Sequence, residues 1–122
     1  MEAIFGVPAD PEVAARTFAD AYGVSLVVLT LGADGALAWH DGEVARHPAF
    51  PTDVVDRIGA GDAFDAGFLY GWLERDIAWG LRCGNALAAL KQTYRGDATW
   101  STLADLQELV QSETVDPRRV AR

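Results

Sequence analysis

Residues 54–69 read VVDRIGAGDAFDAGFL, and this stretch decides how the rest of the chain is interpreted. Two valines lead into a Gly-Ala-Gly run at 59–61, and an apolar helical pattern follows at once. Glycines let a backbone turn tightly and approach a ligand closely. The first amides of a helix have no partner inside the helix and face outward, with the helix dipole behind them. The stretch therefore predicts an anion-binding corner.

Asp62 falls in the first turn of this predicted helix. A carboxylate in that position can take a proton from a hydroxyl that attacks a bound phosphate, so the corner indicates phosphoryl transfer. The alternative is a plain tight turn followed by an aspartate that stabilises the helix dipole, because a motif this short is not specific alone.

The longer run from Gly59 to Phe68 resembles the second signature of the ribokinase-like (PfkB) carbohydrate kinases. The resemblance implies a three-layer, Rossmann-like α/β fold, of which residues 1–122 would form one domain, the C-terminal nucleotide-binding half. It also implies that Asp62 is the catalytic base. The phosphate in transfer would be stabilised by the backbone amides of Gly59, Ala60 and Gly61.

Just upstream, the family's Asp-Thr-Thr is replaced by Asp56-Arg57-Ile58. The resemblance implies that Asp56 lies beside a monovalent cation such as K⁺, here without the two neighbouring hydroxyls. It further implies MgATP as the phosphate donor, held by backbone amides and Mg²⁺ rather than by a basic surface.

Composition and charge limit the classes of function. The chain has 122 residues, of which 50% are hydrophobic, and a formal charge of −8, which argues against nucleic acid or an anionic membrane as partners. We find no apolar run of membrane-spanning length in the sequence. The single cysteine, Cys83, lies in an apolar helical pattern and predicts a core position and a reducing, cytoplasmic location. Residues 114–122 are expected to be a frayed tail.

The order of predicted elements is helix, strand, hairpin and three further helices. Asp10-Pro11 begins the first helix and Gly23 ends it. Residues 25–31 lack polar alternation and predict a strand that is buried on both faces of a parallel sheet. Asp41-Gly42 predicts a hairpin turn. The helices are expected at 61–75, which is apolar nearly all round and so predicted to be central and buried, at 77–93, and from a cap at Ser101 or Thr102.

A second candidate site follows the predicted strand, because ligands of open α/β sheets bind beyond the strand ends. The run Thr30-Leu31-Gly32-Ala33-Asp34-Gly35 resembles the family's Thr-x-Gly-x-x-Gly loop, which lines the ATP phosphates. The nucleotide contacts implied here are Thr30, Gly32, Asp34 and Gly35. His40 and His47 flank the hairpin without metal-ligand spacing, so we expect solvated or packed imidazoles.

Two further nucleotide contacts are implied near the C-terminus. Asn85 is polar within an apolar helix; a surface position would explain it, but the segment also resembles the family's adenine side. The turn around Gly96 resembles the one that contributes backbone groups to the purine pocket.

The resemblance covers only the C-terminal part of such kinases, and the family's Asn-x-x-Glu motif is absent. Three functions stay open: a kinase for a sugar or sugar acid, a catalytically incomplete nucleotide-binding module, and a pure interaction protein. Among kinases, the chain looks most like 2-keto-3-deoxygluconate kinases, with ribose or fructose types as the alternative. Half of a sheet leaves an exposed edge, so we expect self-association or a second chain that covers it.

Overall fold

The computed structural model describes residues 10–96 and 101–111. The elements are, in chain order, α2 (Pro11–Tyr22), β1 (Leu26–Thr30), the short 3₁₀ helix η1 (Gly32–Asp34), β2 (Ala36–His40), β3 (Glu43–His47), α3 (Ala60–Glu74), α4 (Ile77–Lys91) and α5 (Leu103–Val110). The predicted tail at 114–122 lies outside these residues.

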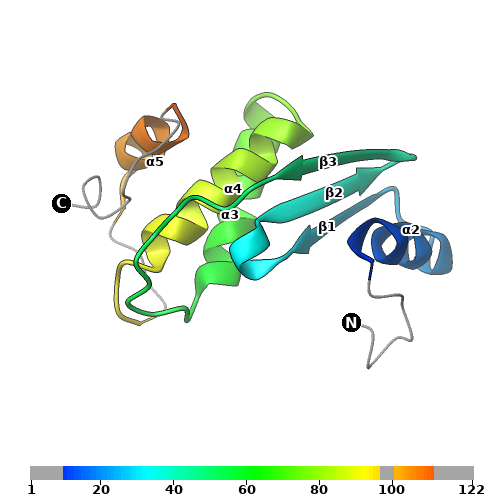
Figure 1. Cartoon of the computed structure of the whole chain (residues 1–122). Helices are drawn as coiled ribbons and strands as arrows, with labels where there is room; N and C mark the ends of the chain where they lie inside the picture. Colours follow the sequence, from blue (N-terminus) through cyan, green and yellow to red (C-terminus); the bar gives the residue numbers. More distant parts are fainter. Residues whose placement is uncertain (1–9, 97–100, 112–122) are drawn as a thin grey trace.

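The described residues form three layers (Figure 1), with α2 on one face of the sheet and the α3–α4 pair on the other. Val27 and Leu37 point from the sheet toward Ala15 and Ala19 of α2. Their strand neighbours point the other way and pack with α3 and α4, namely Ala36 and Ala38 against Phe64, Phe68 and Leu81. The predicted three-layer α/β arrangement is confirmed.

The strand predicted at 25–31 is present, but its pairing differs from the prediction. The sheet has the order β1-β2-β3 and both pairings are antiparallel, so the expected parallel neighbour is not found in the described part of the chain. The unbroken apolar run has another cause: helices cover both faces of β1, which removes the alternation of a half-exposed strand. The outer edge of β1 carries no strand partner among these residues.

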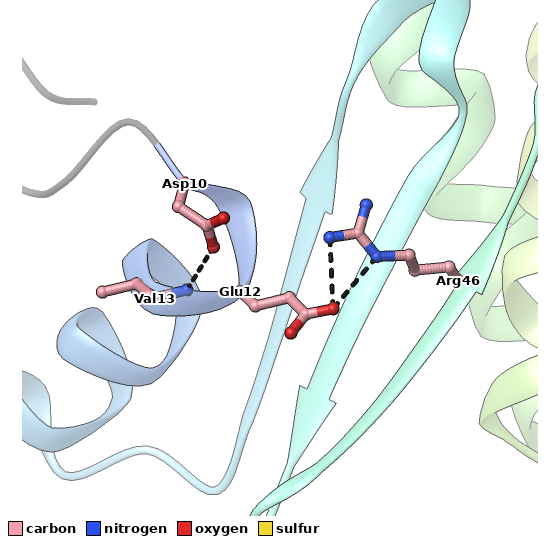
Figure 2. A network of polar contacts seen from close by, with 4 residues as sticks. All are labelled: Asp10, Glu12, Val13 and Arg46. Carbon is pink, nitrogen blue, oxygen red and sulfur yellow. Dashed lines mark hydrogen bonds and ion pairs between the residues drawn. The ribbon is translucent and has the colours of Figure 1, made fainter.

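The hairpin and the first helix follow their local signals. Asp41 and Gly42 both have positive φ angles, 49° and 90°, as the two-residue turn between β2 and β3 requires. The Asp10 carboxylate accepts a hydrogen bond from the Val13 amide at 3.0 Å and caps α2 (Figure 2). Gly23 ends that helix in the left-handed conformation.

One ion pair links α2 to the far strand of the sheet. Arg46 donates to Glu12 Oε1 from both Nε and Nη2 at 3.2 Å (Figure 2). Both side chains are about half exposed, so the pair contributes on the order of 0–1 kcal/mol. The ion pair therefore adds little to the stability of the fold.

Helices α3 and α4 pack at backbone distance because glycines face each other along their contact. A Cβ atom built on Gly67 would lie 2.5 Å from the Cys83 carbonyl oxygen, and one on Gly71 would lie 2.8 Å from the Gly80 Cα. In return, a Cβ on Gly84 would lie 2.7 Å from the Phe64 ring. The close approach of α3 and α4 therefore depends on these glycines.

The prediction that the helix at 61–75 is central and buried is wrong. α3 buries Phe64, Gly67, Phe68 and Gly71, whereas Leu69 is half exposed and Leu73 is 83% exposed. Helix α4 is the central one, because α3 packs on one side of it and α5 on another, and its buried residues face both. The apolar back of α3 has no cover among the described residues.

The C-terminal helix completes the fold and covers the cysteine. Thr102 caps α5 in a reciprocal capping box with Asp105, and Leu106, Leu109 and Val110 pack on α4. Cys83 is fully buried in this cluster, and burial raises the pKa of its thiol to about 11. Of the helices described, none has the combined length and apolarity that crossing a bilayer requires.

Candidate functional site

The glycine turn and the helix start from which the sequence predicts an anion-binding corner are both present. Gly59 has a φ angle of 80°, a left-handed conformation that favours glycine, and α3 starts at the next residue. The Ala63 amide donates to the Gly59 carbonyl at 2.9 Å and is the first to bond inside the helix. The Ala60 amide is already used, since it donates to the Arg57 carbonyl at 3.1 Å.

The amides of Gly61 and Asp62 therefore stand in the first turn, where the helix offers them no acceptor. The space beside Gly61 is open, because a Cβ built there would meet no atom within 4 Å. The Asp62 side chain is exposed in the same turn. The corner thus combines amides that have no acceptor in the helix, the positive end of a helix dipole and an exposed carboxylate within one turn.

Asp56 fastens the loop before the corner to the end of α4. Its Oδ1 accepts from the Ile58 amide and its Oδ2 accepts from the Gly96 amide, both at 2.9 Å. The amides of Val55 and Asp56 in turn donate to the Gln92 carbonyl at 2.8 and 3.1 Å. These bonds from Ile58 and Gly96 lower the pKa of Asp56 below its usual 3.8, so the carboxylate stays ionised.

A pocket of about 380 Å³ lies next to this loop, between η1, the segment 49–57 and α4. Its lining residues are Gly32, Ala33, Ala49, Phe50, Pro51, Thr52, Val54, Arg57, Asn85, Ala88, Ala89 and Gln92. Thr52 Oγ1 is buried and lacks a hydrogen-bond partner within the described residues. The size is that of a small-molecule site, and the lining mixes apolar walls with a few polar groups.

Asn85 lines this pocket and also binds residues 47–48, which lead into the lining segment. The side chain is 7% exposed, and its amide nitrogen donates to the carbonyls of His47 at 3.1 Å and Pro48 at 3.2 Å. The surface position considered for Asn85 is therefore excluded.

The His47 side chain lies in the same region and contacts Pro48 and Arg82. Its Nδ1 lies 2.7 Å from the Pro48 carbonyl and its Nε2 lies 3.0 Å from Arg82 Nη1. We assign the tautomer in which Nδ1 donates to Pro48 and Nε2 accepts from Arg82, because Arg82 can only donate. Burial lowers the pKa of His47 below its usual 6.5 and the Arg82 charge lowers it further, against the Pro48 carbonyl, which raises it.

Stability should therefore depend on pH through His47. Because the folded pKa is lowered, the unfolded chain takes up the proton first as pH falls, and stability is lost below pH 6.5. We expect His47→Gln to flatten the fall of the free energy of unfolding between neutral pH and the folded pKa. Chemical denaturation across pH measures this, with His40→Gln, at the exposed end of β2, as the matched control. A His47→Gln profile parallel to the wild type would contradict the assignment.

The structure brings together some of the predicted site residues and separates others. Gly32 and Asn85 line one pocket, and Asp56 contacts Gly96, while Asp62 lies on the corner beyond the pocket lining. Thr30 and Asp34 are exposed at the end of β1 and in η1, outside that lining. Gly35 has a φ angle of 90°, and a Cβ built on it would collide with the His47 carbonyl. The backbone conformation and this close approach already require a glycine at the position.

Two residues of this region were not identified from the sequence as contributors. Arg57 lines the pocket next to the corner. Lys91 is buried at the end of α4, and its ammonium group contacts the Asp56 and Tyr94 carbonyls. The available signal was that the only lysine of the chain follows the apolar run LAAL.

No group of three or more His, Cys, Asp or Glu side chains in the described ranges could hold a metal ion. The contacts of the two histidines are those of packed and exposed side chains: His47 lies against Pro48 and Arg82, and the His40 side chain is 43% exposed beside Asp41. Mg²⁺ usually keeps several waters and binds through one or two carboxylates plus substrate phosphates, and the exposed Asp62 is a carboxylate of that kind.

Comparison with solved structures identifies the architecture. Fructokinase from Vibrio cholerae O395, crystallised with fructose, ADP and potassium ion, matches with a TM-score of 0.76 and 29% identity over 89% of this chain and 37% of that one. Aminoimidazole riboside kinase from Salmonella enterica, solved with aminoimidazole riboside and an ATP analogue, matches with a TM-score of 0.75 and 28% identity over 89% and 38%. The ribokinase-like fold is confirmed.

Sequence comparison agrees. A 2-dehydro-3-deoxygalactonokinase of Haloferax volcanii is 37% identical over 111 residues, which are 90% of this chain and 35% of the relative. The chain thus spans about a third of such relatives, less than the predicted half. The model of the pfkB family carbohydrate kinases matches residues 1–104, a range that includes the sheet, the pocket and the corner. On this match, the chain belongs to the pfkB family of carbohydrate kinases.

Proposed function

We propose that the protein transfers the γ-phosphate of ATP to a hydroxyl of a sugar or sugar acid. The observation that carries the proposal is the corner: the amides of Gly61 and Asp62 have no acceptor inside the helix, the space beside Gly61 is open, and the Asp62 side chain is exposed in the same turn. Phosphoryl transfer depends on positioning and on electrostatic stabilisation of phosphate charge, which this arrangement supplies. Similar structures that hold ADP or an ATP analogue support ATP as the donor.

In this proposal the pocket takes the nucleoside and the corner takes the phosphate. Gly32 and Asn85 line the nucleoside site, with the loop from Thr30 to Gly35 and the Gly96 turn at its borders. The unpartnered Thr52 hydroxyl and the Arg57 side chain offer polar contacts for a bound nucleotide. Mg²⁺, arriving on the phosphates, would neutralise part of their charge.

At the corner, the amides of the 59–62 turn stabilise charge on the phosphate while Asp62 takes the proton of the attacking hydroxyl. Among the three amides predicted from the sequence, that of Ala60 is bound to Arg57, and the Asp62 amide stands free beside that of Gly61. The corner is built so that the base and the anion site belong to one helical turn, which fixes their separation.

For the acceptor we propose 2-keto-3-deoxygluconate. The name of the Haloferax volcanii relative, a 2-dehydro-3-deoxygalactonokinase, supports an acceptor of the same 2-keto-3-deoxy acid class. Relatives named fructoselysine 6-kinase and 6-phosphofructokinase keep sugars of the fructose type as the alternative.

We also propose a cytoplasmic location. The chain's single cysteine is buried and free, which suits the reducing cytoplasm.

The test is a coupled ADP-release assay on the full reading frame that contains these residues, with MgATP and 2-keto-3-deoxygluconate, 2-keto-3-deoxygalactonate, fructose or ribose. We expect turnover with a 2-keto-3-deoxy acid to exceed turnover with either neutral sugar. Turnover with ribose or fructose alone would show that the proposed acceptor is wrong and would leave the proposed kinase activity intact. Nucleotide binding without turnover on any acceptor would favour the second candidate below.

The second candidate is a catalytically incomplete nucleotide-binding module. This candidate concerns the given residues taken alone, which span about a third of the length of the relatives that they match. The open edge of β1 and the exposed apolar side of α3, with Leu69 and Leu73, support the further proposal that another chain or a second copy covers this side.

A further inference from the structure

The buried lysine at the end of α4 is a charge that the proposed mechanism does not use. Lys91 is 1% exposed, the largest fully buried side chain in the described part. An ammonium group in such a place needs partners, because burying an unpaired charge is very costly. Its Nζ donates to the Tyr94 carbonyl at 3.2 Å and reaches the Asp56 carbonyl at 3.5 Å.

These two carbonyls belong to the segments that position the corner. Asp56 lies in the loop that runs into Gly59, and Tyr94 lies in the turn that leads to Gly96. The Asp56 carboxylate joins the same two segments by accepting the amides of Ile58 and Gly96. The Lys91 charge contributes, after those hydrogen bonds, to the lowered pKa of Asp56.

Carbonyl oxygens that converge beside a carboxylate are the ligands that hard cations take in proteins. Potassium is present in the similar Vibrio cholerae fructokinase, so a monovalent cation is a reasonable expectation for this chain too. In this chain a free ion cannot bind the Asp56 and Tyr94 carbonyl oxygens in the same way, because the Lys91 ammonium group already contacts both of them. Ammonium and K⁺ have the same charge and similar size.

We propose that Lys91 is a built-in cation, whose ammonium group joins the loop at 55–58 to the turn at 94–96 and makes the corner independent of free K⁺. Lys91 touches neither phosphate nor acceptor in this proposal; it is a positioning residue that acts through Asp56. The inference rests on the proposed function only where turnover is measured.

The first test needs no activity. Thermal unfolding of wild type and Lys91→Met is measured in tetramethylammonium, potassium and ammonium chloride at equal ionic strength. Methionine keeps the approximate length of the side chain and removes the charge. We expect the wild-type Tm to be equal in all three salts, and the variant to be lower by at least about 5 °C in tetramethylammonium and raised again by K⁺ or NH₄⁺.

The second test applies the same salts to turnover. Wild-type turnover should not change between them, whereas Lys91→Met should lose about tenfold or more in tetramethylammonium and recover in K⁺. Arg95→Met, which removes an exposed cation of the same turn, is the matched control and should not create a response to K⁺.

A wild type that is stabilised or activated specifically by K⁺ would overturn the proposal, and so would a folded Lys91→Met that ignores K⁺ and NH₄⁺. If Lys91→Met does not fold in any salt, the wild-type comparison decides alone. Absence of turnover in every sample would count against the proposed kinase function, while the melting curves would still test Lys91.

Discussion

Asp62→Asn is expected to lower kcat by about 10²- to 10⁴-fold, the usual contribution of a general base. The amide keeps the shape of the side chain but cannot take the proton of the attacking hydroxyl. Because Asp62 lies outside the pocket lining, the affinity for ATP should stay within about twofold, well under the tenfold that 1.4 kcal/mol would give. Steady-state rates and calorimetric ATP titration on the same protein measure the two quantities.

The matched control is Asp20→Asn, the same change on an exposed side chain of α2, across the sheet from the corner. It should keep wild-type turnover. Asp62→Asn turnover within threefold of the wild type would show that the assigned base is wrong, even if ATP binding were confirmed.

The largest effect on stability is expected for Gly67→Ala, with a loss of about 2–3 kcal/mol in the free energy of unfolding. The new Cβ would lie 2.5 Å from the Cys83 carbonyl oxygen and 2.9 Å from the Cys83 carbonyl carbon. Both atoms are backbone of α4, so the helices must separate to accept the methyl group. The higher helix propensity of alanine, worth up to about 1 kcal/mol, offsets only part of this cost.

Gly61→Ala on the same helix is the control for stability, because a Cβ there meets nothing within 4 Å. It should be neutral or slightly stabilising in urea denaturation. Equal effects of the two substitutions would mean that α3 and α4 do not pack at backbone distance, and the placement of α3 beside α4 would then be wrong.

Local chemistry made part of the fold predictable. Asp10 and Gly23 mark the ends of α2, and Asp41-Gly42 marks the hairpin, because in each case the residue satisfies a local backbone need. The pairing of β1 could not be predicted, since an apolar run reports burial on two faces and carries no information about strand direction. The exposed side of α3 was missed because composition shows which surfaces need cover, not whether cover is present.

The site shows the same division. The corner was predictable because glycines, helix start and Asp62 are contiguous in sequence. The joining of Asp56 to Gly96 and of Asn85 to the His47 carbonyl spans about forty residues, which no local pattern encodes. Lys91 was missed because a lysine near a helix C-terminus is ordinarily a solvated charge that stabilises the dipole. Only the fold reveals that its ammonium group contacts the Asp56 and Tyr94 carbonyls.

The central claim is that the turn from Gly59 to Asp62 holds the γ-phosphate. It is tested most directly by ¹H–¹⁵N correlation spectra of the chain titrated with MgATP and, separately, with MgADP. We predict that both nucleotides shift pocket amides such as Gly32 and Ala89, and that only MgATP strongly shifts the amides of Gly61 and Asp62. Identical spectra of the 59–62 turn with the two nucleotides, or no shift there with MgATP, would contradict the account.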